Sequence, residues 1–537
     1  MSGGASGGAV DGAGAGTSAG VRAATGAGVS GPKDGPDVSA ETVGVLALGR
    51  GTFDVPFAEA KLEAAFDALE RTGAAIVGPR TLLMDGDAVG AALDAMRDAG
   101  VTVTLIVQAT FTDAAATVRI SERHGDRPLA VWAFPEPREG GRLRLNAFCG
   151  LNLAAHALGR IDRAPGCLYA DPGTVEATTL RELIAGHLVP PAPPVGPAEV
   201  DGVSPAAARA VAALHGARIG RVGEHPEGFD TCDYDERRLD ALARVAVEPI
   251  DLRDAFAAAD AAPEGAVARA RAIATADCGD LSDMEPGELD KSLRLHAALE
   301  GLRMRGRYDA FAVRCWPECF TEHGGAMCAP VAMMGEGRTP CACEADVYGA
   351  LSSLLAQALA DAPAFLVDLV DMDAADDTGV VWHCGQAPIS MVAGGAHAAK
   401  GGAGEATGSN APARSTTHSP ARSPARSPAR ARPTVHTNRR MALLYEFALR
   451  PGRVTMLRLS QARGEHSMVI ATGEALARPG AFTGTSGVVR FDAPVPYVRD
   501  ALLGGGVEHH TALVYGDHAP AAREVAAELG VPVMMLT

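Results

Sequence analysis

Val43-Gly-Val-Leu-Ala-Leu48, followed at once by Gly49, is the stretch that decides the fold class of the first part of the chain. A short apolar run that ends in glycine is typical of a buried β-strand. Helical patterns over Phe57–Thr72 and Ala88–Ala99 alternate with further strand-like runs at 74–77, 101–107 and 129–134. This alternation predicts a parallel sheet with crossover helices.

The Pro-rich segment 189–195 is typical of a stiff linker. Beyond it, strand-like and helical patterns alternate again, at 217–222, 266–276, 288–305, 311–314, 346–360 and 364–370. After residue 440 the pattern changes to three strand-like runs, 441–447, 452–459 and 468–473, joined by short turns. The predicted fold class is therefore α/β, with two Rossmann-like α/β domains at 42–190 and 191–360 and a β-rich, barrel-like C-terminal domain at 361–537.

Two segments have too few large apolar residues to build a core. Residues 1–41 are mostly Gly, Ala, Ser and Val, and we expect a disordered N-terminal extension there. Residues 394–433 are also of low complexity and contain three Ser-Pro-Ala-Arg units that begin at Ser419, Ser423 and Ser427. We interpret this second segment as a disordered insertion that loops outward from the C-terminal domain.

Composition excludes several classes of function. The formal net charge of −17 disfavours nucleic-acid binding, because phosphate contacts need clustered Lys and Arg. No apolar run reaches the roughly 18–20 residues that span a bilayer, and the N-terminus lacks a secretory apolar block. Ten cysteines without a secretion signal predict free thiols in the cytoplasm.

The residues that could carry chemistry concentrate between Tyr308 and Pro388. Cysteines are frequent there, but no pair of Cys-x-x-Cys knuckles exists, so structural zinc is disfavoured. Glu344 precedes a predicted helix, where it could instead complement the helix dipole, and Asp368 ends an apolar run, where it could instead cap a strand. His383 and the pair His509-His510 each could be a core or a surface histidine. Together, two carboxylates and an imidazole suit Mn²⁺ or a similar divalent ion.

These motifs resemble the L-fucose isomerase family, in the broader group that includes L-arabinose isomerase. The resemblance is carried by Glu344 in Ala342-Cys-Glu-Ala-Asp346, by Asp368 in Phe365-Leu-Val-Asp368, and by Val507-Glu-His-His-Thr-Ala-Leu-Val-Tyr-Gly516. It implies two α/β domains, a β-rich C-terminal domain and a homo-oligomer. It also implies metal ligation by Glu344, Asp368 and His510, with His509 as the alternative register, and by His383 as a candidate fourth ligand.

The resemblance further implies an aldose–ketose isomerase that works through an enediol, with Glu344 and Asp368 moving the protons. Arg314, Trp316 and Glu318 lie in a motif expected to line the same cleft, where Trp316 would pack on the sugar and Arg314 or Glu318 would bind hydroxyls. Trp316 could equally be a core residue. A sugar-binding relative without catalysis, and an epimerase or lyase that acts on a modified sugar, remain open alternatives.

Overall fold

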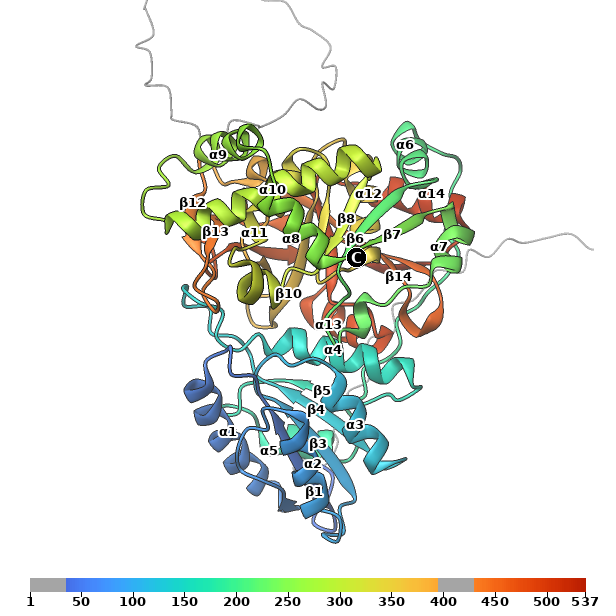
Figure 1. Cartoon of the computed structure of the whole chain (residues 1–537). Coiled ribbons are helices and arrows are strands. Elements are labelled where there is room, and N and C mark those ends of the chain that lie inside the picture. The colour runs from blue at the N-terminus through green and yellow to red at the C-terminus, as the bar shows by residue number, and fades with distance from the viewer. Residues whose placement is uncertain (1–34, 395–428) are drawn as a thin grey trace, which may run out of the picture.

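The computed structural model describes residues 35–394 and 429–537, which build three β-sheets with their helices (Figure 1). The predicted N-terminal extension and the predicted insertion therefore lie mostly outside the described residues. Gly394 and Ala429 lie against each other, so the chain on the two sides of the gap meets at one point of the molecule. No helix within the described ranges is long and apolar enough to cross a membrane.

The first sheet has five parallel strands in the order β2-β1-β3-β4-β5. Its strands and helices are β1 (Thr42–Leu48), α1 (Val55–Glu70), β2 (Ala75–Val77), α2 (Gly86–Ala95), β3 (Val103–Gln108), α3 (Ala115–His124), β4 (Leu129–Ala133), α4 (Ala147–Arg160), β5 (Gly166–Tyr169) and α5 (Ala177–Ile184). Helix α1 begins at Val55 because the Asp54 carboxylate accepts a hydrogen bond from the Phe57 amide and Pro56 occupies the first turn.

The second sheet has four parallel strands in the order β7-β6-β8-β9. Its elements are α6 (Pro205–Leu214), β6 (Arg218–Val222), α7 (Glu236–Ala243), β7 (Ala246–Ile250), α8 (Leu252–Asp260), α9 (Glu264–Cys278), α10 (Pro286–Gly306), β8 (Ala310–Val313), α11 (Cys328–Glu336), β9 (Cys341–Cys343) and α12 (Val347–Ala360). Strand β7 was not predicted, because it is a largely exposed edge strand that contains Pro249 and lacks a sustained apolar run.

The third sheet is mixed and has nine strands in the order β12-β13-β16-β11-β10-β17-β14-β15-β18. An additional pairing of β15 with β16 closes six of the strands into a ring. Its elements are β10 (Phe365–Asp373), β11 (Thr378–His383), β12 (Arg432–Val435), β13 (Ala442–Ala448), β14 (Gly452–Ser460), β15 (Ser467–Ala475), β16 (Thr485–Phe491), α13 (Val495–Gly505), β17 (His510–Tyr515), α14 (Ala519–Leu529) and β18 (Val533–Leu536). The predicted fold class is thus confirmed, while the domain limits stay predictions.

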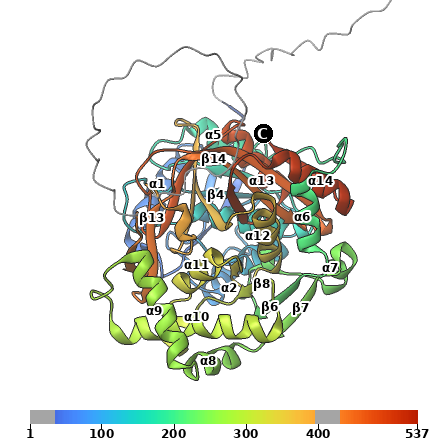
Figure 2. The same ribbon diagram turned by 90° about the horizontal axis from the view of Figure 1, so that it is seen from above.

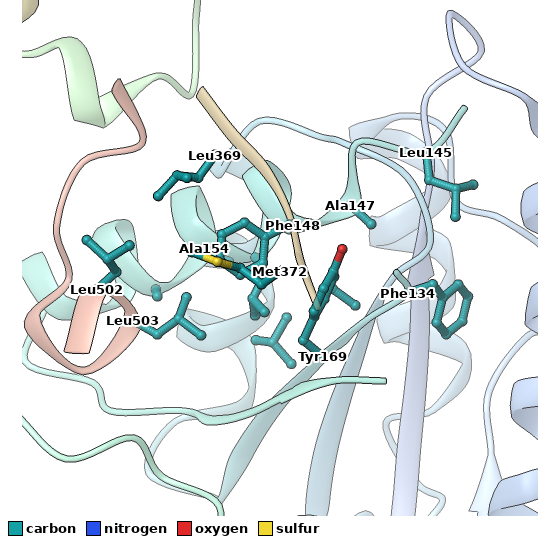
Figure 3. Close-up of a cluster of buried hydrophobic side chains, with 14 of the residues drawn as sticks. Phe134, Leu145, Ala147, Phe148, Ala154, Tyr169, Leu369, Met372, Leu502 and Leu503 are labelled. Atoms are coloured by element: carbon teal, nitrogen blue, oxygen red, sulfur yellow. The ribbon is translucent and has the colours of Figure 1, made fainter. Parts of the chain in front are cut away.

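Two buried helices join the three sheets. Helix α4 packs against β4 of the first sheet and against β10 and α13 of the C-terminal region. In Figure 3, Phe148 and Ala154 lie among Leu369, Met372, Leu502 and Leu503. Helix α12 contacts β8 and β9 of the second sheet on one side and β14 and β17 on the other, and Figures 1 and 2 both show it beside α6. The three sheets therefore share apolar cores, which holds the edges of all three around one cavity.

Candidate metal centre

A pocket of about 830 Å³, including its open mouth, lies where the three sheets meet. The first sheet contributes Arg50, which follows β1, and Phe111, which follows β3. The second sheet contributes Cys315 after β8 and Glu344 after β9. The carboxyl ends of parallel strands are where α/β sheets bind ligands, and here two such edges face one pocket. The C-terminal sheet supplies the remaining wall.

Glu344 reaches the pocket through a strained turn. Glu344 and the following Ala345 both have left-handed backbone angles, with φ of 60° and 55°. Residues with side chains rarely adopt this conformation, and it is often retained at functional sites. Two such residues in a row turn the chain sharply between β9 and α12, and Asp346 then caps α12 by accepting a hydrogen bond from the Gly349 amide at 2.8 Å.

Strand register brings Asp368 and His510 together. In the antiparallel pair of β10 and β17, Asp368 lies directly opposite His510. Directly opposed residues of such a pair have neighbouring side chains on one face of the sheet. The predicted helix and returning strand between Glu344 and Asp368 are α12 and β10. The apolar pattern had indicated that Asp368 lies near the end of a strand. Strand β10 continues to Asp373, so Asp368 lies within the strand instead.

The donor atoms of these residues converge. Asp368 Oδ1 lies 3.5 Å from His510 Nε2, and Glu344 Oε2 lies 3.6 Å from the same nitrogen. Asp368 Oδ1, His510 Nε2 and His509 Nδ1 are buried and have no hydrogen-bond partner among the described residues. Buried polar atoms are normally satisfied, so atoms left without partners fit a ligand that the protein binds there. Carboxylate oxygens and imidazole nitrogens suit a divalent cation of the Mn²⁺ type.

The structure places both histidines of the 509–510 pair at the site. His509 Nε2 donates to Glu344 Oε2 at 3.1 Å and lies 3.9 Å from Asp368 Oδ1, and the two imidazole rings stack with centroids 4.0 Å apart. Asp368, His509 and His510 form one group of donor atoms that all lie within 4.8 Å of one another. His383 lines the same pocket and stacks on His510 at 5.7 Å, but its nitrogens belong to no such group among the described residues.

A thiol also approaches the site. Cys232, Glu344 and His510 form a second group of donor atoms within 4.8 Å. Burial raises the pKa of the Cys232 thiol well above its usual value, and the nearby carboxylates of Asp346 and Glu344 add to this. All ten cysteines are free thiols, and Cys232 is the one that belongs to a donor group among the described residues.

The electrostatics of the centre suit metal binding. Burial and the neighbouring His509 lower the pKa of His510, so this imidazole is neutral near pH 7 and can donate a lone pair. Burial would raise the pKa of the Glu344 carboxyl, but the hydrogen bond from His509 and the nearby imidazoles hold it below its usual value. Both groups therefore take the protonation state in which they can ligate a cation.

The residues of the Arg314-Cys-Trp-Pro-Glu318 motif do not all lie in the pocket. Trp316 lines the pocket and donates its indole N–H to Glu344 Oε1 at 3.0 Å. Arg314 and Glu318 bind each other through two hydrogen bonds of 2.6 and 2.7 Å, and neither lines the pocket. Because their charged groups are already paired four residues apart, the structure does not bring them to the expected hydroxyl-binding position.

Several pocket residues were not singled out from the sequence. Arg50 follows β1, and His436, Asn438 and Arg439 lie in the turn between β12 and β13. Arg439 has no carboxylate within 4.0 Å in the described part of the chain, and burial together with the charge of Arg50 lowers its pKa. Behind the centre, Arg458 in β14 is fully buried and pairs with Asp346. An arginine between Leu457 and Leu459 was a usable signal, because a buried charge needs a partner.

Buried carboxylate and imidazole donors that converge in a pocket between three sheets suit a metal-binding enzyme, and comparison with known proteins identifies the family. Residues 44–187 match the fucose/sulfoquinovose isomerase N-terminal domain, and residues 434–537 match the L-fucose isomerase C-terminal domain. A sulfoquinovose isomerase of Alkalicoccus urumqiensis is 30% identical over 76% of this chain and 80% of its own length. A sulfoquinovose isomerase of Priestia megaterium is 27% identical over 89% of this chain and 95% of its own length.

The chain belongs to the fucose/sulfoquinovose isomerase family, as the motifs around Glu344, Asp368 and His510 had indicated, and it is an aldose–ketose isomerase. The family does not by itself define the sugar.

Proposed function

We propose that this isomerase depends on a divalent cation, Mn²⁺ in the first instance, held by Glu344, Asp368 and His510. The observation that carries the proposal is the convergence of their donor atoms, two of which are buried without any partner in the described residues. His509 supports the site by donating from Nε2 to Glu344, and the same nitrogen lies 3.9 Å from Asp368 Oδ1. When bound, the cation would polarise two adjacent oxygens of an open-chain sugar.

The two carboxylates are suited to the proton transfers of an enediol reaction. One of Glu344 and Asp368 removes the proton from C2 of the open-chain aldose and returns it at C1 of the enediol, and the other moves the proton between the two oxygens. Trp316 holds Glu344 through its indole N–H, and its ring faces the pocket. Phe53, Phe111 and Trp382 also line the pocket, and a less polar surrounding strengthens electrostatic interactions at the reacting carbons.

We infer further that the sugar carries an anionic group, as sulfoquinovose does. Arg50 and Arg439 both line the pocket, and their mutual repulsion contributes to the lowered pKa of Arg439. Arg50 is paired with Asp113, but Arg439 has no carboxylate partner in the described residues. Two cations facing one cavity favour a bound anion, and guanidinium groups bind such oxygens well. The names of the relatives support the same substrate.

The test is product analysis by NMR with sulfoquinovose, L-fucose and a panel of neutral aldoses. We expect conversion of sulfoquinovose to its ketose, incorporation of solvent deuterium at the transferred position in D₂O, and loss of activity after chelation that added Mn²⁺ restores. A product that keeps the aldehyde, or bond cleavage, would mean an epimerase or a lyase. Binding without turnover, insensitive to chelator, would mean a sugar-binding protein.

Matched variants locate the chemistry. Glu344→Gln should abolish turnover, while Glu318→Gln, which alters a carboxylate paired with Arg314 outside the pocket, should keep it. Arg439→Gln should raise the KM for sulfoquinovose, while Arg440→Gln, an exposed neighbour, should not. If Arg439→Gln affects neutral and sulfonated sugars equally, the anionic-substrate proposal is wrong.

A homo-oligomer and a cytoplasmic location remain predictions of the sequence. Light scattering on the purified protein measures the oligomeric state.

A further inference from the structure

A chain of buried charges lies directly behind the proposed metal centre. It runs from His510 through Asp346 and Arg458 to Glu508, and the side chains of all four are at most 1% exposed. Asp346 lies in the turn before α12 and Arg458 in β14. His510 begins β17 and Glu508 lies in the loop just before it, so the chain of charges joins three separate regions. None of Asp346, Arg458 and Glu508 lines the pocket.

The two carboxylate oxygens of Asp346 accept hydrogen bonds from different sets of donors. Oδ2 accepts from His510 Nδ1 at 2.9 Å and from Arg458 at 2.7 Å. Oδ1 accepts from the Gly349 amide at 2.8 Å and from Arg458 at 3.2 Å. Every contact is with a donor, so the ionised carboxylate is the form that fits.

We propose that Asp346 is a positioning residue that keeps the proton of His510 on Nδ1 and so leaves the Nε2 lone pair facing Glu344 and Asp368. The proposal rests on the proposed metal-dependent function. A carboxylate behind a ligating imidazole fixes both the tautomer and the ring orientation. Here Nε2, at 3.6 Å from Glu344 and 3.5 Å from Asp368, is the nitrogen without a partner among the described residues.

Arg458 lies between two carboxylates, Asp346 on one side and Glu508 on the other. Arg458 contacts both oxygens of Asp346, and its Nε lies 3.3 Å from Glu508 Oε2. Glu508 is fixed in turn by the Ser460 hydroxyl at 2.6 Å and the Gln461 amide at 2.8 Å, and it has no hydrogen bond to His510 in the described structure. Two carboxylates share one arginine, so either carboxylate can be neutralised without leaving the buried arginine unpaired.

Because Asp346 and Glu508 share Arg458, Asp346→Asn and Glu508→Gln form a matched pair of variants. Each removes one negative charge from the same arginine with little change in size, and asparagine still caps a helix. In Asp346→Asn, the amide oxygen is retained at the Oδ1 position, where it still accepts from the Gly349 amide and from Arg458 Nη2. The amide nitrogen then takes the Oδ2 position, where it faces His510 Nδ1 and can no longer accept the hydrogen bond from Arg458 Nη1. The amide nitrogen donates, which forces the His510 proton onto Nε2 and removes the lone pair from the metal site.

The first measurement is Mn²⁺ affinity, by calorimetry and by electron paramagnetic resonance. We expect Asp346→Asn to weaken binding by about 10- to 100-fold and Glu508→Gln to change it by less than about threefold. Equal losses in both variants would show that the network acts only through its charge or its packing, and an unchanged affinity in Asp346→Asn would also overturn the proposal.

The second measurement needs no metal. Nitrogen-15 NMR of histidine-labelled, metal-free protein reports which ring nitrogen of His510 carries the proton, with the resonance assigned by His510→Gln. We expect the proton on Nδ1 in the wild type and in Glu508→Gln, and on Nε2 in Asp346→Asn. A proton on Nε2 in the wild type would overturn the positioning role. If the wild type binds no Mn²⁺, the proposed function fails, but the NMR result still decides the role of Asp346.

Discussion

Strand β10 contains two buried aspartates, three residues apart, whose surroundings differ completely. Asp371 accepts hydrogen bonds from Arg138 and from the Tyr169 hydroxyl, whereas Asp368 Oδ1 has no partner in the described structure. An irregularity in the pairing with β11 falls between Leu369 and Asp371, and it changes the register between the two carboxylates. A buried carboxylate with partners stabilises the fold, while one without partners costs stability and is kept for a ligand.

The largest difference between the two aspartates is expected in catalysis, and it is tested by neutralising each of them in turn. Asp368→Asn should lower kcat/KM by on the order of 10³-fold, because it removes a metal ligand and a proton-transfer group. Asp371→Asn should keep kcat/KM within about threefold, since Asp371 does not line the pocket. Steady-state kinetics at saturating Mn²⁺ measure both. Comparable losses in the two variants would contradict the division of roles.

The effects of the two variants on folding stability should have the reverse order, with the larger loss in Asp371→Asn. Asp371→Asn leaves Arg138 without its main carboxylate partner and should lower the free energy of unfolding by about 2–3 kcal/mol. The loss stays below that for a fully buried pair because Arg138 is 19% exposed and keeps its hydrogen bonds to Thr378. Asp368→Asn should leave the metal-free protein as stable as the wild type, or more so. Urea unfolding in the presence of chelator measures both values, and a larger loss in Asp368→Asn would refute the prediction.

The two variants should also differ in how much added Mn²⁺ stabilises them against unfolding. At a free Mn²⁺ concentration of ten times Kd, the metal should add about 1.4 kcal/mol to the unfolding free energy of the wild type and of Asp371→Asn. Asp368→Asn should gain almost nothing at the same concentration, because a ligand is missing. Unfolding with and without Mn²⁺ measures the gain, with Mg²⁺ as the comparison ion. An equal gain in all three proteins would place the metal elsewhere.

The smallest expected effect is a dependence on pH. Burial raises the pKa of Asp371 despite the opposing charge of Arg138, so the folded protein keeps a proton that the unfolded chain has lost. This contribution to stability therefore falls as the pH rises from the unfolded value near 3.8 through the folded pKa. Asp371→Asn lacks this titration, so its stability deficit should be larger at pH 5 than at pH 8. A stability deficit of Asp371→Asn that grows as the pH rises would contradict this prediction.

The sequence was most informative where patterns repeat. The alternation that begins at Val43 predicted the parallel sheets, and the spacing from Glu344 to Asp368 predicted a helix and a returning strand. It was least informative where contacts are long-range. The pairing of Asp346 with Arg458 joins residues 112 positions apart, and no local pattern encodes it. Nor does the charge of Arg314 and Glu318 reveal from the sequence that the two side chains pair with each other and do not line the pocket.

The turn from Glu344 to Asp346 has a consequence for how this protein can change over evolutionary time. Three consecutive residues supply a pocket carboxylate, a left-handed backbone step and the cap of α12. An insertion or deletion of a single codon there would displace all three at once, so this turn should tolerate substitutions of side chains far better than changes in length. Variation in substrate choice should therefore accumulate in the separate β12–β13 turn that carries Arg439.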